Sequence, residues 1–553
     1  MQLIERRIGL LSAIFLLFFV LAIGRASKLM VVDHASFKAQ ANGQQVGDIT
    51  VPAPRGAILD RHGDELAVST DAADVSATPY IVKDVPKASA QLAPLLGQTA
   101  QEISAKLADR KSGFVYLARS VPGSVVAKIA KLKIAGIDTT PTTKRAYPGK
   151  TMASQVLGFV GTEGKGLSGL EYRWEKQLHG SDGERRVVKD GQGDAISTVD
   201  VAKVQPGENL QLTLDSQLQL QTEAVMKQVA ANYSPQGASA IVMDPRDGSI
   251  LAMSNYPTLD ANDPGAAEPD ALQNRAVGFN YEPGSTFKAV TVAGALSEKK
   301  VTPSTIIQVP SQLQVEDRTI KDAEEHGPEA LPVSQVIAKS SNIGTALISQ
   351  KMTDATFDSW VHRFGFGSPT GVDLAGEERG LVLSHKEYSG VSKVNFAIGQ
   401  GLDVTPIQMA TAYSAIANGG ILRPPHIVES VGGEPTDRPA GKRVISPRVA
   451  SQLRKMLEGV LGPGGTASEA AIPGYKLAGK TGTAEIFDTV AGEYSKSKYV
   501  ASFIGFAPAN DPQLLVSVVV NQPQGEIYGG TVAAPAFQEI LNFALPYLKI
   551  PPN

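Results

Sequence analysis

The sequence of 553 residues contains no cysteine, and its seven histidines are scattered along the chain. The missing cysteine excludes disulfides, thiol catalysis and cysteine-based zinc sites. No HExxH-like spacing is present, so we expect no metal, and no histidine signature supports a Ser-His-Asp mechanism. The chain also lacks a Walker-type glycine loop and a dinucleotide-binding fingerprint, so we expect no cofactor. Its net charge of −3 gives no indication of nucleic acid as a partner.

Long hydrophobic runs are absent apart from one near the N-terminus. Residues 8–24 are all apolar or small apart from one serine, and Arg6 and Arg7 precede them. A run of this length lies at the lower limit for crossing a bilayer and exceeds the usual apolar core of a signal peptide. We therefore expect a transmembrane anchor over residues 8–30 and a cytoplasmic tail over residues 1–7, rather than a cleaved signal peptide. The positive charge before the span predicts that the remaining chain is extracytoplasmic.

A serine followed three residues later by a lysine occurs at three places: Ser285–Lys288, Ser297–Lys300 and Ser495–Lys498. Ser285 follows a Pro-Gly turn and opens an apolar-periodic run, which predicts a buried helix with Lys288 on the same face as the serine. The second pair falls in the polar tail of that helix. The third pair falls in a polar stretch that we expect to be a loop. Only the first pair is therefore a candidate catalytic site.

The chemistry of a serine nucleophile explains the residues found downstream of Ser285. A serine hydroxyl needs a neighbouring base, and lysine serves as one when burial or nearby cations lower its pKa. Lys288 on an apolar helix, with Lys480 nearby, meets both conditions. Ser340 can relay a proton and Asn342 can bind a substrate amide, although the segment around them also fits a helix N-cap.

The segment Lys480-Thr481-Gly482-Thr483 occurs once and precedes an apolar run. Gly482 would let a bound peptide approach the edge of a strand, and Lys480 with the two threonines could bind a terminal carboxylate. An ordinary edge strand guarded by a lysine explains the same segment. The combination and order of the three motifs favour serine acyl transfer, because SxxK, SxN and KTG form one catalytic set.

The chain divides near residue 205 into two regions of different composition. Residues 33–205 have short strand-like pieces, with one helix expected over 88–106, and their charged residues are expected on solvated faces or in interdomain salt bridges. Residues 209–548 begin with a strand at 210–214 and a helix capped by Asp215, followed by a hairpin over 238–253. Further strands at 499–506 and 514–520 and a helix at 535–547 close this region. Strands at both ends of a helical insert predict an α+β fold, with one antiparallel sheet flanked by helices.

Taken together, these motifs resemble those of class B penicillin-binding proteins, nearly from end to end. In the C-terminal region the resemblance rests on Glu282-Pro283-Gly284-Ser285-Thr286-Phe287-Lys288, Ser340-Ser341-Asn342, Ala397-Ile398-Gly399-Gln400-Gly401 and Lys480-Thr481-Gly482-Thr483. In the N-terminal region it rests on Arg55-Gly56-Ala57-Ile58-Leu59-Asp60-Arg61, Arg145-Ala146-Tyr147-Pro148 and Gly169-Leu170-Glu171. It implies a pedestal, or dimerisation-type, domain over residues 33–205 and a transpeptidase domain over residues 209–548.

The resemblance implies a peptidoglycan D,D-transpeptidase that cross-links stem peptides and is acylated by β-lactams. It assigns Ser285 as the nucleophile, Lys288 as the base and Ser340 as the proton relay. Backbone N–H groups of Ser285 and Thr483 would form the oxyanion hole. The implied catalytic residues are Ser285, Lys288, Ser340 and Lys480. The implied substrate-binding residues are Asn342, Thr481, Gly482 and Thr483, and Lys480 also helps the two threonines to bind the terminal carboxylate.

The resemblance is to the septal subtype. It rests on the spacings of 55 positions from Ser285 to Ser340 and 138 from Asn342 to Lys480, on the overall length and on the tail that ends soon after Tyr547. The alternative is an elongation-specific penicillin-binding protein 2. No glycosyltransferase domain is expected, so the resemblance implies a SEDS polymerase such as FtsW and other divisome membrane proteins as partners at the cytoplasmic membrane. A β-lactam sensor, a β-lactamase and an inactive divisome scaffold share parts of the pattern and remain less favoured alternatives.

Overall fold

The computed structural model describes residues 2–33, 46–189, 195–316 and 318–552. Its contacts divide the chain into two compact units. The first unit comprises residues 1–54, Asp71–Thr143 and Gly180–Pro206, and the second comprises Arg55–Thr70, Lys144–His179 and Gly207–Asn553. Two segments that the sequence places with the pedestal, 55–70 and 144–179, therefore make their contacts with the second unit.

The first unit begins with α1 (Gln2–Ser27), which continues into a π-helical turn, η1 (Lys28–Val32). The predicted apolar helix is confirmed: Arg6–Val31 is the one helix of the described residues that is long and apolar enough to cross a membrane. Residues 2–7, expected as a separate tail, belong to the same helix. The run of leucine, isoleucine and phenylalanine after Arg7 leaves its apolar side chains exposed, as expected for a surface that meets lipid.

The remainder of the first unit contains two sheets and a small helical core. One antiparallel sheet has the order β1 (Val46–Val51), β6 (Gly183–Lys189) and β7 (Ala195–Ala202). Beyond residue 70, β3 (Glu65–Ala77) pairs with β4 (Val115–Pro122), and β5 spans Ile137–Ala146. The core lies under α3 (Val85–Leu96), α4 (Ala100–Lys106) and α5 (Gly123–Lys131).

The single helix predicted over residues 88–106 is wrong, because the structure has two helices there. Gly97 adopts a left-handed φ of +64° and ends α3. Thr99 then caps α4 in a capping box with Glu102. The glycine and the threonine together explain the break between the helices.

The second unit is built on a five-stranded antiparallel sheet. Its order is β10 (Ile250–Tyr256), β9 (Gly237–Met243), β21 (Leu514–Asn521), β20 (Glu493–Ala507) and β19 (Ala478–Asp488). The predicted hairpin and the predicted C-terminal strands are confirmed. Because β20 begins at Glu493, the pair Ser495–Lys498 lies in a strand, and the prediction of a loop there is wrong.

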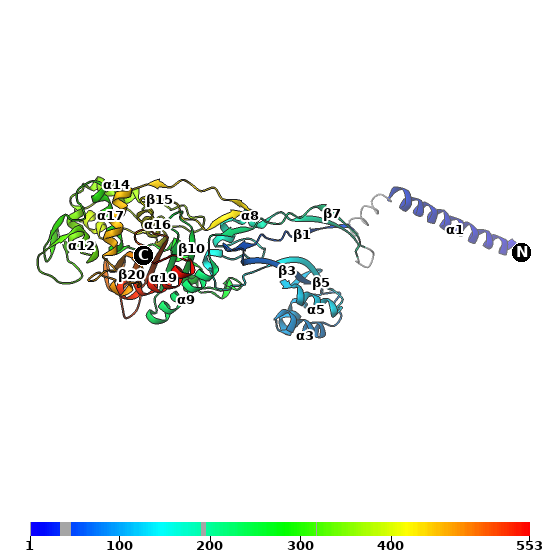
Figure 1. Cartoon of the computed structure of the whole chain (residues 1–553). Helices are drawn as coiled ribbons and strands as arrows, with labels where there is room; N and C mark the ends of the chain where they lie inside the picture. Colours follow the sequence, from blue (N-terminus) through cyan, green and yellow to red (C-terminus); the bar gives the residue numbers. More distant parts are fainter. Residues whose placement is uncertain (1, 34–45, 190–194, 317, 553) are drawn as a thin grey trace. The chain divides into compact units, whose positions relative to one another are not determined.

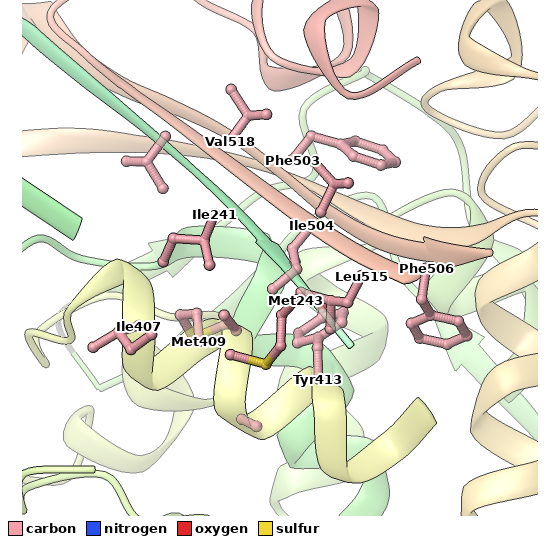
Figure 2. Close-up of a cluster of buried hydrophobic side chains, with 14 of the residues drawn as sticks. Ile241, Met243, Ile407, Met409, Tyr413, Phe503, Ile504, Phe506, Leu515 and Val518 are labelled. Carbon is pink, nitrogen blue, oxygen red and sulfur yellow. The ribbon is translucent and has the colours of Figure 1, made fainter. Parts of the chain in front are cut away.

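Helices cover both faces of this sheet. One face packs against α9 (Ser216–Tyr233) and α19 (Ala534–Tyr547), and the other against α16 (Pro406–Ala417), with α17 (Pro447–Glu458) beside β19. Successive strand residues point to opposite faces, so Phe503 contacts Phe537 of α19 while Ile504 points toward α16 (Figure 2). Figure 2 also shows Ile241, Met243 and Leu515 on the side of Met409 and Tyr413. The predicted α+β fold with a flanked antiparallel sheet is confirmed, and Asp215 caps α9 as predicted.

Shorter helices and strands make up the rest of the second unit, and Figure 1 labels some of them. A second sheet contains β17 (Glu434–Pro435), β16 (Val428–Val431), β8 (Leu210–Leu212) and β2 (Ile58–Leu59). Three small ladders pair β11 (Ile306–Val309) with β14 (Glu329–Pro332), β12 (Leu313–Val315) with β13 (Arg318–Ile320), and β15 (Ile421–Leu422) with β18 (Lys442–Arg443). The other α-helices are α6 (Ser154–Leu157), α7 (Gly169–Arg173), α8 (Glu175–His179), α10 (Arg275–Gly278), α11 (Lys288–Ser297), α12 (Val333–Ala338), α13 (Asn342–Ser349), α14 (Asp354–Arg363), α15 (Ser392–Ala397) and α18 (Gly529–Val532).

Three charged residues of the N-terminal motifs form a buried ion cluster in the second unit. Glu171 is fully buried and accepts hydrogen bonds from Arg55 Nε at 2.5 Å and Arg145 Nε at 2.6 Å. Arg145 also donates to the backbone oxygen of Gly56. We expected the charged residues of this region on solvated faces or in interdomain salt bridges. The first alternative is wrong for these three, which are buried in salt bridges that join segments distant in sequence.

Candidate active site

The turn that carries Ser285 is a short 3₁₀ helix, η4 (Gly284–Phe287), followed directly by α11. Gly284 has a φ of +53°, a conformation that favours glycine, and its N–H donates to the oxygen of Gly399 at 2.9 Å. Tyr413 OH also stabilises this turn, because it donates a hydrogen bond to the backbone oxygen of Thr286 at 2.7 Å. Ser285 is half-buried, so its side chain stands at the surface of a rigid turn.

The segment 340–342 is both a helix cap and part of the site. Ser341 is the N-cap of α13 and accepts a hydrogen bond from the N–H of Gly344 at 2.8 Å. Ser340, before the cap, has a left-handed φ of +62°, which is uncommon for a residue with a side chain. The cap therefore uses Ser341 alone, and Ser340 and Asn342 on either side of it contact Lys288.

Lys288 is fully buried and forms the centre of the cluster. Its Nζ donates to the backbone oxygen of Ser340 at 2.5 Å, to Asn342 Oδ1 at 2.6 Å and to Ser340 Oγ at 3.2 Å. Burial lowers the pKa of Lys288 to about 7, and the negative charge of Asp322 opposes that shift. A substantial fraction of Lys288 is therefore neutral near pH 7 and able to accept a proton.

A second buried lysine shares the same hydroxyl. Lys480 Nζ donates to Ser340 Oγ at 2.8 Å and to the backbone oxygen of Thr481 at 3.2 Å. Burial, together with the charge of Lys288, lowers the pKa of Lys480 well below its usual range. Because donors from two lysines occupy the lone pairs of Ser340 Oγ, the Ser340 proton is directed away from both lysines.

The strand β19 presents the last motif at the edge of the five-stranded sheet, since it pairs only with β20. Gly482 lies against the turn that carries Ser285: a Cβ atom there would stand 3.0 Å from the oxygen of Pro283. Thr481 Oγ1 is 2.8 Å from Thr466 Oγ1, and Thr483 Oγ1 accepts from the N–H of Gly529 at 3.1 Å. Thr481 is buried and Thr483 half-buried, so Thr483 has the more accessible hydroxyl.

The structure thus brings Lys288, Ser340, Asn342 and Lys480 into one hydrogen-bonded cluster, with the Ser285 turn packed against β19. Among the described residues, Ser285 Oγ makes no hydrogen bond. Lys288 Nζ instead uses three donors, as an ammonium group does. Loss of one proton would free a lone pair on Nζ for accepting a proton.

Two parts of the site have no motif of their own in the sequence. Asp322 contacts the Ser341 cap from the loop after β13. Glu282, three residues before Ser285, accepts from Tyr494 OH at 2.9 Å and from the N–H of Gly401 at 3.0 Å, and burial raises its pKa to about 7. Glu282 was singled out only as part of the resemblance. Among the described residues, no three histidine, aspartate or glutamate side chains are grouped as a metal site requires.

The site combines three features: the Lys480 edge strand, the helix that follows Ser285, and the Ser340-Ser341-Asn342 segment. Together they define a serine acyl-transferase of the penicillin-recognising kind. A family model described as the penicillin-binding protein transpeptidase domain matches residues 238–542, and one described as the penicillin-binding protein dimerisation domain matches residues 50–212. The chain belongs to the class B penicillin-binding proteins, which are serine transpeptidases.

Relatives and solved structures agree with this assignment over almost the whole chain. The peptidoglycan D,D-transpeptidase FtsI of Escherichia coli is 33% identical over 100% of this chain and 93% of its own length. The stage V sporulation protein D of Bacillus subtilis is 34% identical over 90% of this chain and 79% of its own length. The crystal structure of penicillin-binding protein 3 from Mycobacterium tuberculosis in complex with aztreonam superimposes with a TM-score of 0.71 at 29% identity, over 91% of this chain and 98% of that one.

Proposed function

We propose that this protein is the septal peptidoglycan D,D-transpeptidase of its cell, and that Ser285 is the residue that becomes acylated. The observation that carries the proposal is the pair of buried lysines that meet at Ser340 Oγ behind the Ser285 turn. Two buried amines without a carboxylate between them lose a proton more readily than free lysines do, so one of them can accept a proton near neutral pH, a property that a purely structural lysine does not require.

The proposed acylation uses each group at a defined atom. Neutral Lys288 Nζ takes the proton of Ser285 Oγ as that oxygen attacks the carbonyl of the D-Ala–D-Ala amide. The backbone N–H groups of Ser285 and Thr483 bind the resulting oxyanion. Ser340 Oγ then gives its proton to the departing D-Ala nitrogen and is reprotonated from the lysine pair. The Ser285 ester remains until an amine of a second stem peptide attacks it.

The same residues account for substrate binding. A stem peptide lying along the free edge of β19 would form backbone hydrogen bonds with it, because an edge strand leaves them unpaired. Gly482 keeps that edge close to Ser285, and Asn342 binds a substrate amide. The terminal carboxylate would lie at Thr483 and Thr481, with the buried amine of Lys480 beside them.

The septal role is supported by the similarity to FtsI along the full chain. The sporulation relative has comparable identity, so the role needs a direct test. We expect a functional fluorescent fusion at midcell during division, together with a SEDS polymerase such as FtsW and other divisome proteins in the cytoplasmic membrane. A fusion distributed along the side wall would instead identify an elongation enzyme.

β-Lactams resemble the scissile amide, and the related penicillin-binding protein 3 has been solved with aztreonam and with ampicillin. We therefore expect stable acylation of Ser285 by a labelled penicillin. Intact-mass spectrometry should show one adduct on the detergent-solubilised wild type and on the Ser297→Ala control, which alters the neighbouring SxxK match. Ser285→Ala should show none. An adduct that persists on Ser285→Ala would refute the proposal, and rapid hydrolysis of the drug would identify a β-lactamase.

A further inference from the structure

The carboxylate of Asp322 binds the residues that flank Asn342. Asp322 lies in the loop between β13 and β14, and its side chain is 10% exposed. Its Oδ1 accepts from the N–H of Ile343 at 2.9 Å, and its Oδ2 accepts from Ser341 Oγ at 2.7 Å. Asp322 therefore binds the residues on both sides of Asn342.

Lys321, the residue before Asp322, binds the Asn342 side chain itself. The backbone oxygen of Lys321 accepts from Asn342 Nδ2 at 2.8 Å, which orients Asn342 Oδ1 toward Lys288 Nζ. Ser340 has a left-handed backbone that persists only where its surroundings impose it. The bonds to Asp322 and Lys321 supply such a constraint, because they fix the start of α13 directly after Ser340.

A histidine faces the same carboxylate. His326 Nε2 lies 3.1 Å from Asp322 Oδ2, its Nδ1 lies 2.7 Å from the oxygen of Gly327, and the side chain is 20% exposed. With both ring nitrogens opposite acceptors, the doubly protonated ring is favoured, and the pKa of His326 is raised above its usual value. The other charged groups near this pair are Lys288 on α11, Glu329 on β14 with its partner Lys339, and the exposed Lys321, Glu324 and Glu325 of the loop.

We infer that Asp322 is a positioning residue for acyl transfer and that His326 regulates it by charge. The carboxylate holds Ser340 and Asn342 on Lys288, and its negative charge favours the protonated form of Lys288. A protonated His326 offsets that charge. Because Lys288 must lose a proton to act as the base, the Asp322–His326 pair sets the pH above which Ser285 is acylated. This inference rests on the proposed function.

The test is the pH profile of penicillin acylation, measured on the solubilised full chain. Asp322→Asn removes the charge and keeps an oxygen acceptor, so the midpoint of the profile should fall by roughly half a unit to one unit. His326→Gln keeps an N–H donor and removes the offsetting charge, so the midpoint should rise. Glu325→Gln, an exposed acid on the same loop, should leave the midpoint unchanged.

Opposite shifts in the two variants support the inference, because a merely structural role would change the rate and not the midpoint. Midpoints equal to the wild-type value in both variants, or shifts in the same direction, would overturn it. If Asp322→Asn does not fold, His326→Gln decides alone: a raised midpoint supports the inference and an unchanged one overturns it. Failure of the proposed function is a separate result, since Ser285→Ala would then still be labelled.

Discussion

At the scale of single residues, the chemistry depends on how water is excluded from two lysines. Lys288 and Lys480 are both fully buried, while Ser285, Ser340 and Asn342 above them are half-exposed. Burial disfavours the ammonium form, so in the proposed mechanism the site holds a base beneath the groups that would contact substrate. Since the two amines share Ser340 Oγ, a proton accepted by one can pass through that hydroxyl.

This arrangement predicts the pH dependence of acylation. The pKa of Lys288 in the folded protein is about 7, so the base is mostly protonated below that pH and mostly neutral above it. The second-order rate of acylation by penicillin should therefore rise with pH and level off above a midpoint near 7. Stopped-flow fluorescence or quenched mass spectrometry over pH 5–9 measures it. A rate that falls as pH rises through 7 would exclude Lys288 as the base.

The sequence predicts the residues of the site better than it predicts their support. SxxK, SxN and KTG have fixed spacings because each lies within one turn or one strand, so local pattern is sufficient to find them. Asp322 contributes through backbone and side-chain contacts made by a loop 18 residues before Ser340. Such a contact depends on how the loop folds back, and no local pattern contains that information.

At the scale of elements, the site depends on close contact between β19 and η4, the turn that carries Ser285. Gly482 leaves no room for a side chain, because a Cβ atom would stand 2.3 Å from Ser502 Oγ and 3.0 Å from the oxygen of Pro283. The Ser502 side chain can rotate away, whereas the backbone of the turn that carries Ser285 cannot. Element type was predictable where a local signal was strong, as with the Asp215 cap of α9 and the apolar run of β21, but the division between α3 and α4 depended on one glycine conformation.

The variant Gly482→Ala should therefore displace the Ser285 turn. We expect slower penicillin acylation and a loss of about 1–3 kcal/mol of stability from overpacking. Gly265→Ala is the matched control, because nothing lies within 4 Å of its Cβ position. Acylation kinetics and thermal unfolding measure the two effects. A Gly482→Ala protein that is acylated at the wild-type rate would show that this contact does not position the nucleophile.

The buried ion cluster predicts a different effect on the same unit. Glu171→Gln leaves the buried Arg145 without a carboxylate partner, while Arg55 keeps Glu175 at 2.6 Å, so unfolding should require about 3–5 kcal/mol less free energy. Glu163→Gln, an exposed acid in the preceding loop, should change stability little. Chemical denaturation of both variants provides the comparison. Equal midpoints would mean that the cluster contributes no net stability.

At the scale of the whole molecule, the absence of cysteine allows a direct test of membrane orientation. Ser497 is exposed on β20, so Ser497→Cys gives the chain a single accessible thiol. In spheroplasts, a membrane-impermeant maleimide should label Ser497→Cys and should label Gln2→Cys only after the membrane is permeabilised. The reverse pattern would place the transpeptidase unit in the cytoplasm and contradict the orientation predicted from Arg6 and Arg7.

The most direct measurement of the central claim is the mass of the covalent intermediate formed with a true substrate. The full chain is incubated with a stem peptide ending in D-Ala–D-Ala, quenched with acid, digested and mapped. We predict release of one D-Ala and an acyl group, lacking that residue, on the peptide that contains Ser285. Added acceptor amine should remove the acyl group as a cross-linked peptide appears. An acyl group on another residue, or D-Ala release by Ser285→Ala at the wild-type rate, would contradict the account.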